Sequence, residues 1–153
     1  MLIFDAHCDI LSKINSEKEL FKNNHHWDAE RALANGPFIQ VFSAFDKTLP
    51  RNKARKSMEK QIKMALSIEE KCPDKFKIIR RKEDLDTCIM EYSRQKVFGI
   101  LEAEGAEILG GSLEEFERLY SLGLRILTLC WNYDNEVCDS VAGDNTHNGL
   151  SGF

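Results

Sequence analysis

Short apolar runs alternate along this chain with longer segments in which apolar residues recur every three or four positions. The short runs are typical of buried β-strands, and the longer segments are typical of amphipathic helices. The main strands are predicted at residues 2–4, 38–45, 97–101 and 124–130, and residues 76–79 are a shorter strand candidate. Helices are predicted at residues 51–71, 82–94 and 112–123. Because alternating strands and helices build parallel sheets, the pattern predicts an α/β fold with four main strands.

Local signals mark the ends of two of these helices. Ser112 and Glu115 form a Ser-x-x-Glu capping box, and Gly123 is typical of a helix carboxyl end. Pro73 ends the long periodic segment at residues 51–71. Residues 12–36 predict at most short helices, and residues 134–153 contain polar turns without a clear element.

Composition limits the class of protein. With 153 residues and 42% hydrophobic residues, the chain is expected to form one domain over residues 1–153, with no second domain. Lys and Arg number 21 against 25 for Asp and Glu, giving a net charge of -4. This balance argues against nucleic acid or an anionic membrane as the main partner.

The sequence also suggests a location. No apolar run approaches the length of about 18 residues that spans a bilayer, and the amino terminus reaches Asp5 without a signal-peptide pattern. We therefore expect a cytoplasmic protein that does not engage a membrane. The five cysteines are odd in number and lack a Cys-x-x-Cys pair, so we interpret them as reduced thiols.

Polar side chains gather where the predicted strands end. His7 and Asp9 follow the first strand, Glu104 follows the strand at 97–101, and Trp131 and Asn132 follow the last strand. Barrel and open-sheet α/β enzymes place their sites at the carboxyl ends of parallel strands. These residues are therefore the candidate site.

Their chemistry suits a metal ion. His7 and Asp9 are two residues apart at a strand end, so both side chains point to the same side. Imidazole nitrogen and carboxylate oxygen are ligands that zinc accepts, and Glu104 is the best candidate for a third ligand. A carboxylate can also bridge two metals about 3.5–4 Å apart, an arrangement that activates hydroxide for hydrolysis.

Structural interpretations remain open for these residues. A His-x-Asp pair is also consistent with a capping aspartate beside a half-exposed histidine. Cys8 alternates to the opposite side of the strand and is interpreted as a core thiol. Glu102 and Glu107 are interpreted as acids that favour the region of a helix amino terminus.

Other motifs carry less chemistry. His25 and His26 are adjacent, so their side chains point apart, and they are interpreted as part of a solvated loop; His147 is interpreted as a turn residue. The basic run at residues 47–63 is interpreted as a solvated helix face. Nucleotide-binding glycine motifs and the Gly-x-Ser-x-Gly hydrolase elbow are absent from the sequence.

Several motifs in this order resemble the membrane (renal) dipeptidase family of zinc peptidases. They are Asp5-Ala-His7-Cys-Asp9, the strand containing Gln40, Ala103-Glu104-Gly105, and the Tyr-x-Leu-Gly-x-Arg-x-Leu-Thr-Leu motif at residues 120–129. The resemblance implies a (β/α)8 TIM-type barrel that hydrolyses dipeptides at a site with two zinc ions. It implies that His7 and Asp9 bind one zinc and that Glu104, the catalytic candidate, bridges both.

The sequence departs from the family pattern in three places. Ala106-Glu107 stands where many members have Gly-His, and Trp131-Asn132 stands near the position of a substrate-contacting histidine in mammalian relatives. The two later histidines that complete the second zinc site have no counterpart here. Since a full barrel takes roughly 250 residues, the chain resembles the amino-terminal half, about four βα units.

Two functional hypotheses follow from this resemblance. The chain is a fragment of a zinc dipeptidase, inactive alone and able to bind at most one zinc. Alternatively, it is a natural or cloned truncation, a non-catalytic half-barrel that self-associates into a homo-oligomer through its open edges. A third hypothesis, a different metal-dependent hydrolase, is disfavoured because many such barrels open with His-x-His.

Overall fold

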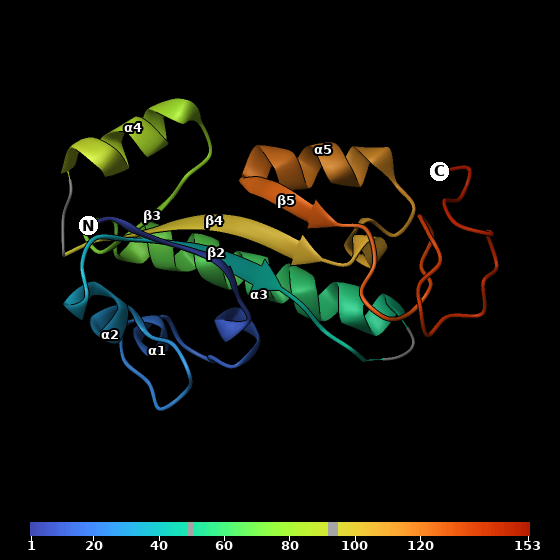
Figure 1. Cartoon of the computed structure of the whole chain (residues 1–153), viewed down its shortest axis with the longest axis horizontal. Helices are drawn as coiled ribbons and strands as arrows, with labels where there is room; N and C mark the ends of the chain where they lie inside the picture. The colour runs from blue at the N-terminus through green and yellow to red at the C-terminus, as the bar shows by residue number, and fades with distance from the viewer. Residues whose placement is uncertain (49–50, 92–94) are drawn as a thin grey trace.

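The computed structural model describes residues 1–48, 51–91 and 95–153 (Figure 1). Its sheet has five strands: β1 (Ile3–Cys8), β2 (Phe38–Ala44), β3 (Phe76–Ile78), β4 (Val97–Glu104) and β5 (Leu124–Thr128). Its α-helices are α1 (Glu17–Phe21), α2 (Ala29–Ala34), α3 (Arg51–Lys71), α4 (Lys82–Glu91) and α5 (Leu113–Leu122). Short 3-10 helices follow two strands, η1 (Ile10–Ser12) after β1 and η2 (Ala106–Leu109) after β4.

All of the strand pairs in this sheet are parallel. β1 pairs with β2, and β2 pairs with β4 along its whole length, from Phe38 opposite Val97 to Ala44 opposite Ala103. The other edge of β4 is shared, because β3 pairs with its first residues and β5 with its last. Parallel strands end at one edge of the sheet, so the loops after β1, β2, β4 and β5 lie together.

Helix α3 covers one face of the sheet and builds the main core. Figure 1 shows it running beneath β2 and β4 in that view. Its fully buried residues recur every three or four positions, at Met58, Ile62, Ala65 and Ile68. They belong to the same core cluster as Phe42 of β2. The amphipathic pattern therefore places α3 where the periodicity predicts.

Helix α4 covers part of the opposite face, on the side of the sheet away from α3 (Figure 1). Ile39 and Phe98 lie opposite each other on this face and are both buried. They form a second cluster with Cys88 of α4, and Leu85 packs against it. Helix α4 thus covers this face near the start of the strands.

The predicted helices and strands are present, and the observed ends of the strands differ from the predicted ends because pairing with neighbouring strands sets them. Helix α3 has the predicted bounds, and Ser112 caps α5 by accepting a hydrogen bond from the backbone N–H of Glu115 at 3.2 Å. β4 extends three residues beyond the predicted end, to Glu104, because neighbours on both sides hold it extended. β5 ends two residues early, at Thr128, since its partner turns into η2.

Residues 92–94 of the predicted helix at 82–94 lie outside the described residues. Residues 12–36 contain only the short helices η1, α1 and α2, as predicted. The described part of the chain contains no helix long and apolar enough to cross a membrane.

Candidate metal centre

The ends of two strands, β1 and β4, bring the three candidate ligands together. His7 lies within β1, Asp9 directly follows that strand at the start of η1, and Glu104 is the last residue of β4. The register between β1 and β2 shifts between Asp5 and Cys8, an irregularity of the kind that reorients side chains near active sites. The regular pairing of β1 with β2 is therefore interrupted at the segment that carries His7.

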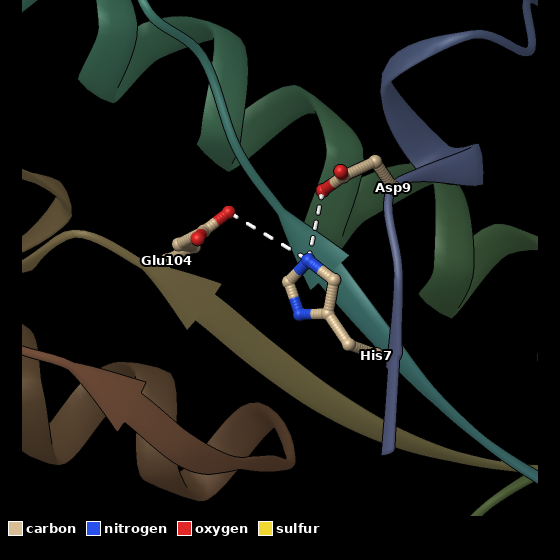
Figure 2. Close-up of side chains that lie close together, drawn as sticks. All are labelled: His7, Asp9 and Glu104. Atoms are coloured by element: carbon tan, nitrogen blue, oxygen red, sulfur yellow. Dashed lines mark ion pairs between the residues drawn. The ribbon is translucent and has the colours of Figure 1, made fainter. Parts of the chain in front are cut away.

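The three side chains converge on a common centre. His7 Nε2 lies 3.5 Å from Asp9 Oδ1 and 3.7 Å from Glu104 Oε2 (Figure 2). One ligand atom from each residue lies within 4.8 Å of the other two. His7 and Asp9 are near neighbours in sequence, whereas Glu104 reaches the centre from another strand of the sheet.

This geometry fits a metal ion. Donor atoms about 2.0–2.2 Å from a tetrahedral zinc lie about 3.3–3.6 Å from each other. The two distances from His7 Nε2 are close to that range. Asp9 Oδ1 is buried and has no hydrogen-bond partner among the described residues, as expected of an oxygen that serves a cation. The donor set of one nitrogen and two carboxylates matches zinc chemistry.

The electrostatics of the cluster also favour a cation. Burial raises the pKa of Glu104 above its usual value, and the negative charges of Asp9 and Glu102 raise it further. Burial of His7 opposes its protonation, but the hydrogen bond to Glu102 and the surrounding carboxylates outweigh burial and raise its pKa. A divalent ion at this point would relieve the repulsion between carboxylates.

Glu102 has a position that sequence reasoning missed. The sequence predicts an acid near a helix amino terminus, and this prediction is wrong, because Glu102 lies inside β4 and is 6% exposed. Its Oε2 lies 2.9 Å from His7 Nδ1, and its Oε1 accepts a hydrogen bond from Thr128 Oγ1 at 3.1 Å. A sequence signal for this position exists. Residues two apart on a strand share a face, so Glu102 must lie on the same face as the candidate ligand Glu104.

Glu107 differs from its expected setting as well. It lies in the first turn of η2, as an acid near a helix start should, but it is 2% exposed. Asn135 Nδ2 donates to its Oε2 at 3.2 Å. Glu107 therefore ties η2 to the loop that follows β5.

The two candidate substrate residues lie in that loop. The ring of Trp131 packs edge to face on Phe45, which follows β2, with centroids 4.9 Å apart. Trp131 and Phe45 line one pocket with Lys13 and Lys47. The backbone carbonyl of Asn132 accepts a hydrogen bond from Ala142. The structure thus assigns a pocket to Trp131 and a loop-stabilising backbone contact to Asn132.

The other histidines do not belong to the cluster formed by His7, Asp9 and Glu104. His25 and His26 are exposed in a loop, as predicted, and His26 Nε2 lies 3.6 Å from Cys8 Sγ. His147 is exposed, and its Nε2 lies 3.0 Å from the carbonyl oxygen of Asn135. Cys8 is a core thiol, 4% exposed, and its burial raises the pKa of the thiol to about 11.

The five cysteines are all free thiols, in agreement with the sequence. Among the described residues, the acidic and histidine cluster on β1 and β4 is the group placed to hold a metal. The fold and this cluster together define an α/β protein with a candidate metal centre at the carboxyl ends of parallel strands.

The family model described as "Membrane dipeptidase (Peptidase family M19)" matches residues 1–153, so the chain belongs to this family. No curated protein matches the chain at a significant level. The resemblance inferred from the sequence motifs is therefore confirmed.

Several solved structures are similar to this chain in fold. Dipeptidase AC, a metallo peptidase of family M19, has a TM-score of 0.77 at 24% identity, over 91% of this chain and 45% of that one. The probable dipeptidase PvdM from Pseudomonas aeruginosa has a TM-score of 0.81 at 18% identity, over 99% of this chain and 42% of that one. A metallo peptidase from Rhodobacter sphaeroides, liganded with a phosphinate mimic of the dipeptide L-Ala-D-Ala, has a TM-score of 0.78 at 22% identity, over 91% of this chain and 48% of that one.

These similarities confirm the α/β fold class and the match to part of a dipeptidase fold. The chain spans less than half the length of each of these structures. A complete eight-stranded barrel stays a prediction.

Proposed function

We propose that residues 1–153 form a partial barrel domain that supplies the amino-terminal half of a zinc dipeptidase site. The observation that carries this proposal is the convergence of His7, Asp9 and Glu104 within 4.8 Å at the carboxyl ends of β1 and β4. Membership of the membrane dipeptidase family supports the reaction class. Zinc as the metal and a cytoplasmic location are predictions from the sequence.

The three residues have different roles in this proposal. His7 Nε2 and Asp9 Oδ1 would hold one zinc, and Glu104 would serve as a further ligand and as the catalytic carboxylate. Zinc bound there would polarise the substrate carbonyl and lower the pKa of water for attack. The chain itself orients the ligands on two strands and excludes solvent around Asp9 Oδ1.

We further propose that the substrate is a dipeptide and that Trp131 contacts it, with Asn132 shaping the same loop. The pocket lined by Trp131 and Phe45 lies beside residues that follow β2 and β5, at the same edge of the sheet as the candidate ligands, and none of the ligands lines it. Lys13 and Lys47 line this pocket together with one acid, Asp46, and the two lysines offer positive charge to a carboxylate. The dipeptide mimic bound to the Rhodobacter sphaeroides enzyme supports the substrate class.

A second candidate function is a self-associating, non-catalytic half-barrel. The observation that favours it is the pair of open edges: in the described residues, the sheet ends at β1 on one side and at β3 and β5, which share the outer edge of β4, on the other. Phe4 on β1 is 58% exposed. Unpaired strand edges and exposed apolar residues both promote association of copies.

Zinc binding by the purified chain tests the proposed site. We expect at most one zinc per chain, bound through His7, Asp9 and Glu104, because the family's later histidines have no counterpart. His7→Ala should weaken binding by more than about 100-fold, since even an outer-shell partner of a zinc ligand contributes about 10–100-fold. His147→Ala removes an exposed histidine and is the matched control.

Competition with a chromophoric chelator measures the affinity, and elemental analysis after dialysis measures the stoichiometry. Two tightly held zinc ions, or binding that survives His7→Ala unchanged, would contradict the proposed ligand set. An active enzyme that needs no metal would contradict the reaction class itself.

A further inference from the structure

Glu102 is a buried carboxylate that no step of the proposed function uses directly. It lies on β4 two residues before Glu104 and shares the face that carries the metal candidates. Only 6% of its surface is exposed. A carboxylate is costly to bury unless both of its oxygens have partners, so its contacts explain why it is there.

Both oxygens of Glu102 are occupied by groups from neighbouring strands. Oε2 lies 2.9 Å from Nδ1 of His7 on β1. Oε1 accepts the hydroxyl of Thr128 on β5 at 3.1 Å. Glu102 therefore connects three strands, with the candidate ligand at one end of the chain of contacts and a neutral hydroxyl at the other.

This contact determines which ring nitrogen of His7 faces the centre. A carboxylate only accepts hydrogen bonds, so Nδ1 must carry the proton that is shared with Glu102. Neutral imidazole then has its lone pair on Nε2, the atom that lies between Asp9 and Glu104. Outer carboxylates of this kind fix the tautomer and the ring orientation of metal-binding histidines.

We infer that Glu102 is a positioning residue that holds His7 as the Nδ1–H tautomer with Nε2 aimed at the metal, and that Thr128 braces Glu102. This inference rests on the proposed metal site. A purely structural ion pair would need only the contact between Glu102 and His7. It would not explain why the opposite nitrogen of the same ring faces two further carboxylates.

Nitrogen-15 NMR of the metal-free protein tests the tautomer without any zinc. In mildly alkaline solution, where imidazole is neutral, wild-type His7 should show a protonated Nδ1. Glu102→Ala should move His7 toward the Nε2–H form. Glu102→Gln should largely keep the wild-type form, because its amide oxygen can still accept from Nδ1.

Zinc affinity is the second readout, measured by chelator competition. Glu102→Ala should weaken zinc binding by about 10–100-fold. Glu102→Gln should lose less than Glu102→Ala, and Thr128→Val should produce a smaller loss, because it removes only the brace. Glu69→Gln is the matched control: it changes a part-buried glutamate paired with Arg80 rather than with a ligand and should leave zinc affinity unchanged.

The outcomes separate the two proposals. If the wild-type chain binds zinc but Glu102→Ala changes neither the tautomer nor the affinity, the positioning role is overturned and the metal site stands. If wild-type His7 is protonated on Nε2, the positioning role is likewise overturned. If the wild-type chain does not bind zinc, the proposed function fails and the inference fails with it. Should Glu102→Ala not fold, Glu102→Gln and Thr128→Val still provide both readouts.

Discussion

His7 and Glu104 come within 3.7 Å of each other although their strands are not neighbours in the sheet. β2 lies between β1 and β4 and pairs with both. Neighbouring strands are about 4.8 Å apart, so the backbones of β1 and β4 are separated by roughly 10 Å. The two side chains therefore meet above β2, on the face opposite α3, and β2 positions the site without supplying a ligand.

Activity is the first property that this arrangement predicts. The isolated chain should hydrolyse dipeptides at less than about one hundredth of the rate of a complete family enzyme, because loss of one transition-state charge contact typically costs 100-fold or more. Release of amino acids from a dipeptide, followed with and without added zinc, measures this rate. Any residual turnover should disappear in Glu104→Gln. Robust turnover that Glu104→Gln abolishes would show that the chain builds a complete site.

Gly105 is the position where a single methyl group should disturb the site most. Its φ is +126°, and a Cβ there would lie 2.3 Å from Oε2 of Glu107, a buried side chain held by Asn135. Gly105→Ala should destabilise the fold by about 1–3 kcal/mol from backbone strain, with a further loss from displacing Glu107. Because Gly105 follows Glu104, zinc affinity should fall as well.

Gly149→Ala is the matched control for that variant. Gly149 has a φ of +116°, and a Cβ there meets nothing within 4 Å. This substitution should therefore cost only the backbone strain and leave zinc binding intact. Urea denaturation and chelator competition on both variants measure the difference, and equal effects on both would contradict the role given to the Glu104-Gly105 corner.

The ion pair between Glu69 and Arg80 predicts a pH dependence of stability. Burial of the Glu69 carboxyl opposes ionisation, but hydrogen bonds from Arg80 and the backbone N–H of Ile78 outweigh burial and lower its pKa. The folded pKa is thus below the unfolded value, so the stabilisation is complete above the ordinary pKa of 4.5 and is lost as the pH falls through the folded pKa.

Glu69→Gln should consequently lower the free energy of unfolding by about 1–3 kcal/mol near neutral pH. The difference from wild type should shrink as the pH falls below about 4.5. Urea denaturation at several pH values measures it. Glu30→Gln, in the exposed pair with Lys22, should change stability by less than about 1 kcal/mol. A Glu69→Gln effect that persists unchanged in acid would contradict this account.

Self-association is the property that the sheet edges predict. Phe4 on β1 and Ile126 on β5 are 58% and 37% exposed, and both edge strands lack an outer partner in the described residues. Phe4→Lys should raise the dissociation constant of the oligomer at least about tenfold, a loss of about 1.4 kcal/mol. Sedimentation equilibrium over a concentration series measures it.

Leu113→Lys is the control, because Leu113 is exposed on α5 rather than on a strand edge. It should leave the association unchanged. A wild-type chain that remains strictly monomeric at high concentration would show that the edges are protected by the fold itself.

The sequence alone predicted the elements whose local signals are strong. The periodicity at residues 51–71 gives α3 its observed bounds, because a one-sided apolar stripe on a helix has one way to be buried. The sequence also selects His7, Asp9 and Glu104 as candidates, since polar residues that end buried strands are conspicuous, and the structure brings these three side chains together.

Tertiary structure decided what depends on contacts between distant segments. The extension of β4 through Glu104 comes from pairing with β2 and β5, and the covering of Phe98 comes from α4. The sequence does not reveal the setting of Glu102, because its hydrogen-bond partner His7 lies 95 positions away along the chain. Local pattern fixes which side chain alternates with which, but only the packed strands determine which of these side chains meet.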